Sequence, residues 1–367
     1  MLESLNIENY RCFPSFKLEK FGRVNLLVGK NNSGKTSILE CVDFLLDFNT
    51  LKSLGEAMIL RGEFFSIENV LEANDSQDRK IELDISSLFN QHTFVKNNQI
   101  SIDGYDHNKE KFERNIKIFE YEKNKEQKDF MEISLKTSVE SQDSISLVIS
   151  ARKGIDAAKF FSSNHNGSYE LNKKLSLPVD FLRSASLRFQ DMLELYDDII
   201  LTDEEKIVLE ALQCIEPEIL QIAPLLSDTF KNSNINAGFV ARVKNNPKRV
   251  SIGSFGDGIW RMLGIALKLV NVKNGILLVD EIDTGLHYSV MYDMWKLILK
   301  TAEKLDIQVF ATTHNSDCWK SLAEVAQDEE IGENDVTIHR IEKGATSSVM
   351  LNVPQMAIAA KRDLEVR

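Results

Sequence analysis

Residues 29–36, GKNNSGKT, fit the pattern G-x-x-x-x-G-K-[ST], in which a lysine and a hydroxyl side chain follow the second glycine. Gly29 and Gly34 permit backbone angles that a side chain forbids, so successive N–H groups can point at one anion where a helix begins. Lys35 would place a charge on the β- and γ-phosphates, and the Thr36 hydroxyl suits Mg²⁺. We therefore predict a nucleotide site to which every residue of the loop contributes: Gly29, Lys30, Asn31, Asn32, Ser33, Gly34, Lys35, Thr36 and Ser37.

The flanking residues supply the setting that this chemistry requires. Residues 24–28, VNLLV, are typical of a buried strand, and residues 37–46 are typical of a helix. Because the motif and its setting agree, phosphate binding is favoured over the alternative, a glycine-containing turn before an ordinary helix.

Three further polar residues each follow an apolar run. Asp280 and Glu281 come directly after ILLV, and His314 comes directly after QVFATT. Asp280 is placed to hold Mg²⁺, commonly through water, and Glu281 is placed to polarise the water that attacks the γ-phosphate. His314 is a candidate γ-phosphate sensor. The alternatives are a solvated strand end for the carboxylates and a structural role for the histidine. Ligands of open α/β sheets lie at the carboxyl ends of the strands, so we expect Gly29, Asp280 and His314 to share one crevice.

The secondary structure predicted between these motifs divides the chain into a head and an inserted lobe. Period-two alternation predicts five antiparallel strands at residues 80–85, 100–103, 116–121, 131–135 and 144–149. We therefore predict an inserted β-rich lobe at residues 49–177, and a head made of residues 1–48 and 178–367. Apolar residues at three- and four-residue steps predict helix from residue 188 to about 226, within a helical subdomain at 188–235. A hairpin then leads to the small-residue loop SFGDG and to a helix over residues 259–270.

Composition excludes some classes of function. The 367-residue chain is 43% hydrophobic and 27% charged, which is an ordinary globular balance. Its net charge of −12 counts against a surface coated with positive charge for general nucleic-acid binding, but it permits a local basic groove. The four cysteines show no C-x-x-C spacing and are expected to be free thiols. No apolar run approaches the roughly 20 residues of a membrane span, and the N-terminus does not look like a signal peptide, so we expect a cytoplasmic protein without membrane contact.

Taken in order, the motifs NYRCF, GKNNSGKT, SFGDG, ILLVDEIDTGLH and ATTHN resemble those of ABC-type ATPase heads of the RecF, SMC and OLD group. The sequence is most similar to stand-alone OLD-like bacterial ATP-binding proteins of the AAA_15 or AAA_21 type. The resemblance covers the chain up to about residue 48 and from about residue 178 onward. It implies an α/β P-loop NTPase fold of ABC-ATPase type, with a mixed or parallel core sheet, helices, the inserted antiparallel lobe and a helical subdomain. It also implies ATP and Mg²⁺ as cofactors.

In such heads two protomers enclose two nucleotides, and the signature loop of one protomer caps the γ-phosphate held by the other. The resemblance therefore implies a homodimer or higher homo-oligomer in which Ser254, Gly256 and Gly258 act on the partner's nucleotide. It makes residues 283–287 a loop near the dimer seam. SFGDG stands where transporters have LSGGQ, which argues against a membrane transporter. Arg11 matches an arginine that reaches the nucleotide in some relatives, and an exposed surface role is its alternative.

The motifs, together with the resemblance, predict a Mg²⁺-dependent ATPase that works as a switch. In this switch ATP closes a homodimer and hydrolysis opens it. By resemblance, the switch would act on DNA or on a separately encoded effector such as a nuclease or toxin, in bacterial anti-phage defence. OLD nucleases carry a Toprim domain, but the roughly fifty residues after His314 are too few for a domain by size alone. The alternative is a RecF-like DNA-binding clamp in repair or recombination, in which four basic residues contact phosphates: Arg242, Lys244, Lys248 and Arg249. A solvated hairpin is the simpler explanation of those four residues.

Overall fold

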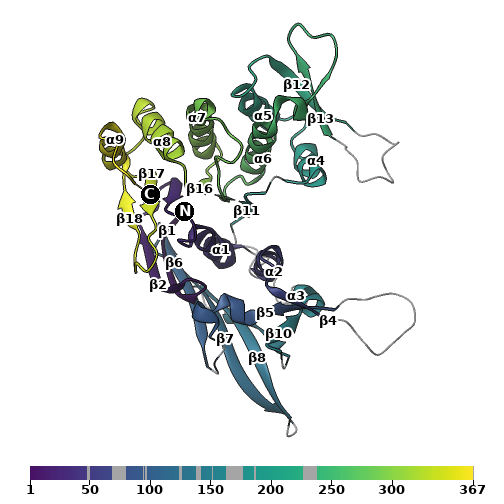
Figure 1. Cartoon of the computed structure of the whole chain (residues 1–367), viewed down its shortest axis with the longest axis vertical. Helices are drawn as coiled ribbons and strands as arrows, with labels where there is room; N and C mark the ends of the chain where they lie inside the picture. The colour runs from purple at the N-terminus through teal and green to yellow at the C-terminus, as the bar shows by residue number, and fades with distance from the viewer. Residues whose placement is uncertain are drawn as a thin grey trace, which may run out of the picture. The chain divides into compact units, whose positions relative to one another are not determined.

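The computed structural model describes residues 1–47, 50–67, 80–93, 95, 97–123, 126–137, 142–150, 152–162, 177–185, 187–225 and 238–366 (Figure 1). They pack as two units. Unit 1 comprises the described parts of residues 1–20, 31–177 and 341–349, and unit 2 those of residues 21–30, 178–340 and 350–367. The boundary crosses the glycine loop, residues 29–36, between Lys30 and Asn31. The strand before the loop therefore belongs to unit 2, and the helix after it belongs to unit 1.

A parallel sheet forms the centre of unit 2. Its strands lie in the order β11 (Val179–Leu182), β15 (Ile276–Val279), β16 (Gln308–Thr313), β3 (Val24–Val28), β17 (Val336–Arg340) and β18 (Val349–Leu351). Each neighbouring pair from β11 to β17 is parallel. Every residue of β3, β15 and β16 is buried, as expected for strands of a parallel sheet that is covered on both faces. The strands predicted from the three apolar runs are confirmed.

The helices of unit 2 each bury a stripe of residues in one shared core. They are α4 (Phe189–Asp197), α5 (Asp203–Gln213), α6 (Asp257–Asn271), α7 (Tyr288–Lys304), α8 (Ser316–Asp328) and α9 (Val353–Lys361). Trp295 of α7 and Trp319 of α8 are among the largest buried side chains of this core, which also includes Leu277 and Val309 of the sheet. Within the described parts of the chain, no helix combines the length and the apolarity needed to cross a bilayer.

The stretch predicted to be helical from residue 188 is helical only in its first part. After α5, the chain forms a small antiparallel sheet of β12 (Ile219–Leu225), β13 (Gly238–Val243) and β14 (Val250–Ser251). A register shift between Ile219 and Gln221 marks a bulge, which lets Ile219 and Ile222 both be buried although they are three residues apart. That spacing is also typical of a helix, so the prediction of helical structure up to about residue 226 is wrong for residues 219–225, which form β12. Residues 226–235 of the predicted subdomain lie outside the described residues.

Unit 1 is built on an antiparallel sheet with the order β2 (Phe13–Glu19), β1 (Leu2–Tyr10), β6 (Gln99–Asp106), β7 (Lys111–Lys123), β8 (Glu126–Thr137) and β9 (Gln142–Val148). A second sheet contains β10 (Gly154–Asp156), β5 (Lys80–Asp84) and β4 (Phe64–Ile67). These strands confirm the five period-two segments. The N-terminal strand β1 pairs with β6 of the predicted lobe, with Leu5 opposite Gly104 and Ile7 opposite Ile102. The division of the chain at residue 48 stays a prediction.

The helix that follows the glycine loop is tied to the lobe at its far end. This helix, α1 (Lys35–Leu46), packs beside α2 (Thr50–Leu60), and α2 packs beside α3 (Ala157–Ser162). Arg114 of β7 is buried, and its guanidinium donates to the carbonyl oxygens of Phe44 and Asp47, each at 3.2 Å. A cation at a helix C-terminus satisfies carbonyls that have no partner within the helix. The lobe therefore helps to hold α1 in place.

A buried histidine makes stability depend on pH. His339 of β17 is fully buried, its Nε2 lies 3.1 Å from Thr337 Oγ1, and its ring packs against Phe21. Burial lowers the pKa of His339 from 6.5 to about 3. Between these values the unfolded chain binds one proton more than the folded chain, so stability is lost as the pH falls below about 6.5. We expect His339 to reduce the free energy of unfolding by about 2 kcal/mol at pH 5 relative to pH 7.5, as measured by urea unfolding.

Replacing the buried ring isolates this contribution. In His339→Gln the titrating group is absent, so the loss of stability between pH 7.5 and pH 5 should shrink by about 2 kcal/mol, whatever the variant's stability at pH 7.5. His92→Gln, at an exposed histidine, is the control for the exchange of histidine for glutamine. Equal pH dependence in wild type and His339→Gln would contradict the assignment.

Candidate active site

The ends of three adjacent strands of unit 2 bring the predicted polar groups to one edge of the parallel sheet. β15 lies beside β16, and β16 lies beside β3. Asp280 directly follows β15, His314 directly follows β16, and Gly29 directly follows β3. Because the three strands are parallel, these residues are at the same, carboxyl edge, where ligands of such sheets bind.

The glycine loop has a backbone that only glycine accommodates at its second glycine. Gly34 has φ 100° and is the N-cap of α1, without a side-chain cap. A Cβ on Gly34 would lie 2.3 Å from Cζ of Phe13 and 2.7 Å from Sγ of Cys12. The loop therefore packs closely on the turn that follows β1. Asn32 also has a positive φ, of 60°.

The side chains of the loop differ in exposure. Lys30, Asn31 and Asn32 are exposed, Gly34 and Thr36 are half-buried, and Gly29, Ser33, Lys35 and Ser37 are buried. The buried Ser33 Oγ has no hydrogen-bond partner among the described residues. Such an orphaned hydroxyl is costly unless a ligand or water completes it.

Two threonines of β16 form hydrogen bonds with residues 280–283, which we call the carboxylate segment. The Thr312 hydroxyl donates to Oδ1 of Asp280 at 2.7 Å and accepts from the N–H of Glu281 at 2.8 Å. The Thr313 hydroxyl donates to Oδ1 of Asp283, also at 2.7 Å. Sequence reasoning missed both threonines as site residues. The signal in the sequence was a pair of hydroxyl side chains at the end of a strand expected to be buried, since a buried hydroxyl needs a hydrogen-bond partner.

Glu281 adopts a strained backbone and faces the histidine. Its φ is 49°, in the left-handed region, which costs a residue with a Cβ about 1 kcal/mol or more. Its Oε1 lies 3.9 Å from Nδ1 of His314, and both side chains are about half exposed. Strain of this kind clusters at functional sites. The arrangement leaves a carboxylate open to solvent at the carboxyl edge of the sheet, beside an imidazole.

The signature loop, residues 254–258, begins helix α6 as predicted. Ser254 is exposed, and its hydroxyl donates to the carbonyl of Ser251. Gly256 has φ 94° and is the N-cap of α6, again without a side-chain cap. A Cβ on Gly258 would lie 2.8 Å from the carbonyl oxygen of Gly285, so the start of α6 packs backbone to backbone against the turn after Glu281.

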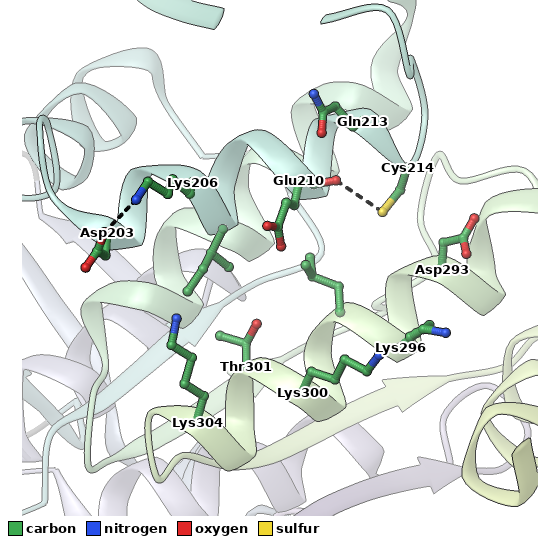
Figure 2. A pocket seen from close by; sticks show the side chains of 12 residues that line it. Asp203, Lys206, Glu210, Gln213, Cys214, Asp293, Lys296, Lys300, Thr301 and Lys304 are labelled. Carbon is green, nitrogen blue, oxygen red and sulfur yellow. Dashed lines mark hydrogen bonds and ion pairs between the residues drawn. The ribbon is translucent and has the colours of Figure 1, made fainter. Parts of the chain in front are cut away.

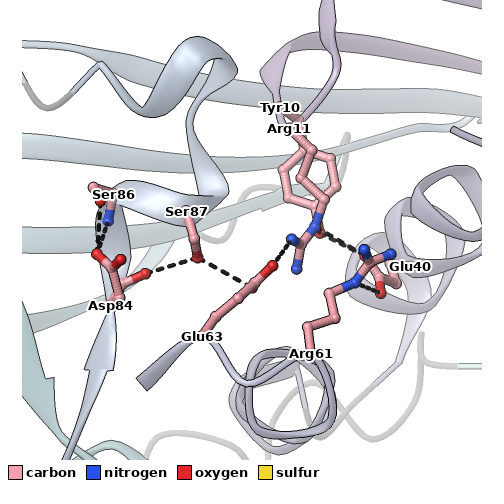
Figure 3. A network of polar contacts seen from close by, with 8 residues as sticks. All are labelled: Tyr10, Arg11, Glu40, Arg61, Glu63, Asp84, Ser86 and Ser87. Carbon is pink, nitrogen blue, oxygen red and sulfur yellow. Dashed lines mark hydrogen bonds and ion pairs between the residues drawn. The ribbon is translucent and has the colours of Figure 1, made fainter. Parts of the chain in front are cut away.

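Arg11 lies at the centre of a buried polar network in unit 1 (Figure 3). Its side chain is 7% exposed, so the alternative of a surface arginine is wrong. Its Nε is 3.0 Å from both the Tyr10 hydroxyl and Oε2 of Glu40, and its Nη1 pairs with Glu63. Arg61 pairs with the other oxygen of Glu40 at 2.8 Å. Nη2 of Arg11 has no partner among the described residues, and contact with the nucleotide stays a prediction.

The family of the chain follows from its match to known proteins. The family model described as AAA ATPase domain, AAA_15, matches residues 1–318. The chain belongs to this AAA ATPase family. It is an ATPase of the AAA/ABC type, and the predicted similarity to RecF in sequence and to SMC heads in fold is confirmed.

Individual relatives agree with this assignment. An "ATP/GTP phosphatase" of Helicobacter pylori is 22% identical over 353 residues, which are 90% of this ATPase and 90% of that protein. The DNA replication and repair protein RecF of Clostridioides difficile is 49% identical over 47 residues, which are 13% of this chain and 12% of RecF. Among solved structures, an SMC head bound to the C-winged helix domain of ScpA has a TM-score of 0.52 and 12% identity, covering 96% of this chain and 97% of that one. At this identity the SMC structure shows the shared fold, which confirms the predicted fold class.

The loop of the ATPase fits a triphosphate with a divalent cation. α1 begins at the loop without a side-chain cap, and a buried hydroxyl points from the loop without a partner. Uncapped N–H groups and an orphaned hydroxyl are the donors that phosphate oxygens satisfy. Thr36 and Asp280 offer hard oxygen atoms, which Mg²⁺ prefers. The predicted residues therefore match the group that the family binds.

A separate cleft of about 750 Å³ lies between α5 and α7 of the ATPase (Figure 2). Its lining includes none of the predicted site residues, and it mixes acidic with basic side chains. Lys206 pairs with Asp203 at 2.7 Å, and Lys296 and Lys300 pair with Glu329. Burial raises the pKa of Cys214 in this cleft to about 11, which makes its thiol a weak nucleophile.

Proposed function

We propose that this ATPase hydrolyses ATP with Mg²⁺ at a site assembled from the glycine loop and the carboxyl edge of the parallel sheet. The observation that carries the proposal is the adjacency of three strand ends, which places the start of the loop, the carboxylates and the histidine in one row. Backbone N–H groups of the loop and Lys35 would bind the phosphates, with Ser33 supplying a buried hydroxyl. Thr36 and Asp280 would hold the metal ion, which neutralises charge on the β- and γ-phosphates.

In this proposal Glu281 takes the proton of the attacking water, and His314 senses the γ-phosphate. The half-exposed Glu281 carboxylate can reach a water, while its backbone is held from β16 by Thr312. A general base must lie within hydrogen-bond reach of the proton that it removes, so a fixed backbone supports this role. The 3.9 Å between the carboxylate and His314 would let the histidine respond to what binds beside Glu281.

We further propose that two copies of the chain close around two ATP molecules. The signature residues Ser254, Gly256 and Gly258 would then cap the γ-phosphate held by the other copy. Ser254 and Gly256 are exposed, and the N-terminus of α6 behind them has no side-chain cap, which is what an anion-binding surface requires. ATP-driven closure and opening would act on a separately encoded effector, such as a nuclease or toxin, in bacterial anti-phage defence.

A RecF-like DNA clamp is the second candidate. The short stretch shared with RecF supports it, as do four exposed basic residues on the hairpin of β13 and β14: Arg242, Lys244, Lys248 and Arg249. Against it stands the net charge of −12. DNA binding that weakens steeply with salt and disappears when the four residues are changed to Glu would favour the clamp.

Replacement of the loop lysine tests the proposed ATP site. In Lys35→Ala the phosphates lose a buried cation, so we expect ATP affinity to fall by about 10²-fold or more and hydrolysis to be lost at cellular ATP concentrations. A fluorescent ATP analogue and phosphate release measure the two effects. Lys17→Ala, at an exposed lysine of β2, is the matched control and should behave as wild type. Wild-type ATP affinity in Lys35→Ala would contradict the proposed site.

A further inference from the structure

Helix α6, which begins at the signature loop, carries a buried arginine that donates hydrogen bonds to the carboxylate segment. Arg261 of α6 is 3% exposed. Its Nη1 donates to the carbonyl oxygen of Arg183 at 2.7 Å, and its Nη2 donates to the carbonyl oxygens of Asp280 and of Glu281, the latter at 3.0 Å. One guanidinium therefore joins α6 to the end of β11 and to both proposed active-site carboxylate residues.

Stability alone does not explain an arginine at this position. Burial is the largest influence on Arg261 and lowers its pKa, against the opposing influence of Asp280, Asp283 and Glu281. Among the described residues its three hydrogen bonds all go to main-chain carbonyl oxygens, and its Nε has no partner. A buried charge of this kind costs desolvation, and an apolar side chain of similar volume would often stabilise the fold as well or better. The arginine is better explained by the geometry that it imposes.

That geometry concerns the backbone of Glu281. The N–H of Glu281 is held by Thr312 of β16, and its carbonyl oxygen is held by Arg261 of α6. Together these contacts fix both polar groups of a residue with φ 49°. The backbone sets the direction in which the Cα–Cβ bond leaves the main chain, so these two contacts fix the point from which the Glu281 carboxylate extends.

We propose that Arg261 is a positioning residue that sets the Glu281 carboxylate according to the position of α6. The inference rests on the proposed role of Glu281 as general base. α6 starts one residue after Gly256 of the signature loop, so a shift of that loop moves the helix that carries Arg261. The close contact between Gly258 and Gly285 is a second link between the start of α6 and the same turn. Binding of the signature loop to the partner's nucleotide would in this way change the position of Glu281 in the same protomer.

Variants of Arg261 test this role when their effect on kcat is compared with their effect on ATP affinity. Arg261→Met keeps an apolar chain of similar length but loses all three hydrogen bonds, and we expect kcat to fall by about 10²-fold because the carboxylate is misplaced. ATP affinity should stay within about threefold of wild type, since no phosphate contact is lost. Arg261→Lys keeps a hydrogen-bond donor, so its kcat should be about tenfold higher than that of Arg261→Met. It also serves as the second variant should the methionine chain fold poorly.

Lys268→Met is the matched control on the same helix. Lys268 is partly buried and ties α6 to β11 through Asp180, but it does not touch the carboxylate segment. Its loss removes that tie between α6 and β11, while kcat should stay within about threefold of wild type. If Arg261→Met reduces kcat no more than Lys268→Met, or reduces ATP affinity in the same proportion as kcat, the positioning role is overturned.

A double variant separates failure of this inference from failure of the proposed function. If Arg261 acts through Glu281, then adding Arg261→Met to Glu281→Gln should slow hydrolysis by less than about threefold further. Independent, multiplied effects would overturn the inference and leave the role of Glu281 intact. Wild-type hydrolysis in Glu281→Gln alone would instead overturn the proposed function.

Discussion

Glu281→Gln is expected to slow ATP hydrolysis by about 10²- to 10⁴-fold while ATP still binds. The amide keeps the shape of the side chain and its place beside His314, but it cannot accept the proton of the attacking water. The backbone contact with Thr312 is unaffected by the change, so the left-handed turn should persist. The ATP-bound state should therefore accumulate. Phosphate release under single-turnover conditions measures the chemical step directly.

The same variant tests closure around ATP. A state that binds ATP and cannot hydrolyse it is stabilised by mass action, so light scattering should show the mass rising toward a dimer when ATP and Mg²⁺ are added. Glu324→Gln, at an exposed glutamate of α8, is the control and should keep wild-type turnover and mass. Turnover of Glu281→Gln within threefold of wild type would exclude the general base. A mass that does not respond to ATP would contradict the nucleotide-driven dimer.

Ser254→Arg is expected to abolish hydrolysis by itself and to regain it when mixed with Lys35→Ala. A long cation in the signature loop blocks the small-residue surface that would meet the γ-phosphate, whereas Lys35→Ala disables the glycine loop. In a mixed dimer, one site combines the intact glycine loop of the first variant with the intact signature loop of the second. With random pairing, about a quarter of all sites are of this kind, so the mixture should recover about a quarter of wild-type turnover.

Ser254 can be replaced without a change to the core of the protein. The side chain is exposed, and its hydroxyl bonds to a carbonyl of its own loop, so arginine can be placed there without disturbing the core. Phosphate release is measured for each variant alone and for the equimolar mixture. Ser254→Ala, which keeps a small side chain, serves as control and should lose much less activity than Ser254→Arg. Full activity of Ser254→Arg alone would argue against a site completed by a second copy.

Much of the fold and of the candidate site was predictable because local rules act strongly there. Apolar runs at residues 24–28, 276–279 and 308–313 have the pattern of buried parallel strands, and the structure confirms all three. Polar residues placed directly after such runs must meet at one edge, whatever the details of the turns. Period-two alternation was equally reliable for the antiparallel strands of unit 1.

The errors and omissions arise where tertiary contacts override or extend local patterns. The bulge at Ile219 gives β12 a three-residue apolar spacing that a helix would also show, and only pairing with β13 distinguishes the two. Thr312, Thr313 and Arg261 were missed because their types are common and their roles depend on partners about 20 to 30 residues away. Burial of Arg11 was likewise invisible, since Glu40 and Glu63 come from α1 and from just after α2.

The sequence by itself determined which groups can bind phosphate and metal, because glycine conformational freedom, lysine charge and hydroxyl or carboxylate ligands are properties of residue type and spacing. It also determined that these groups would follow buried strands. Only the tertiary structure decided how they are held: the order of β15, β16 and β3, the left-handed turn at Glu281, and the threonine and arginine contacts on either side of it. Hydrogen bonds between distant segments depend on ångström-scale placement, which packing of the whole core sets and no local pattern encodes.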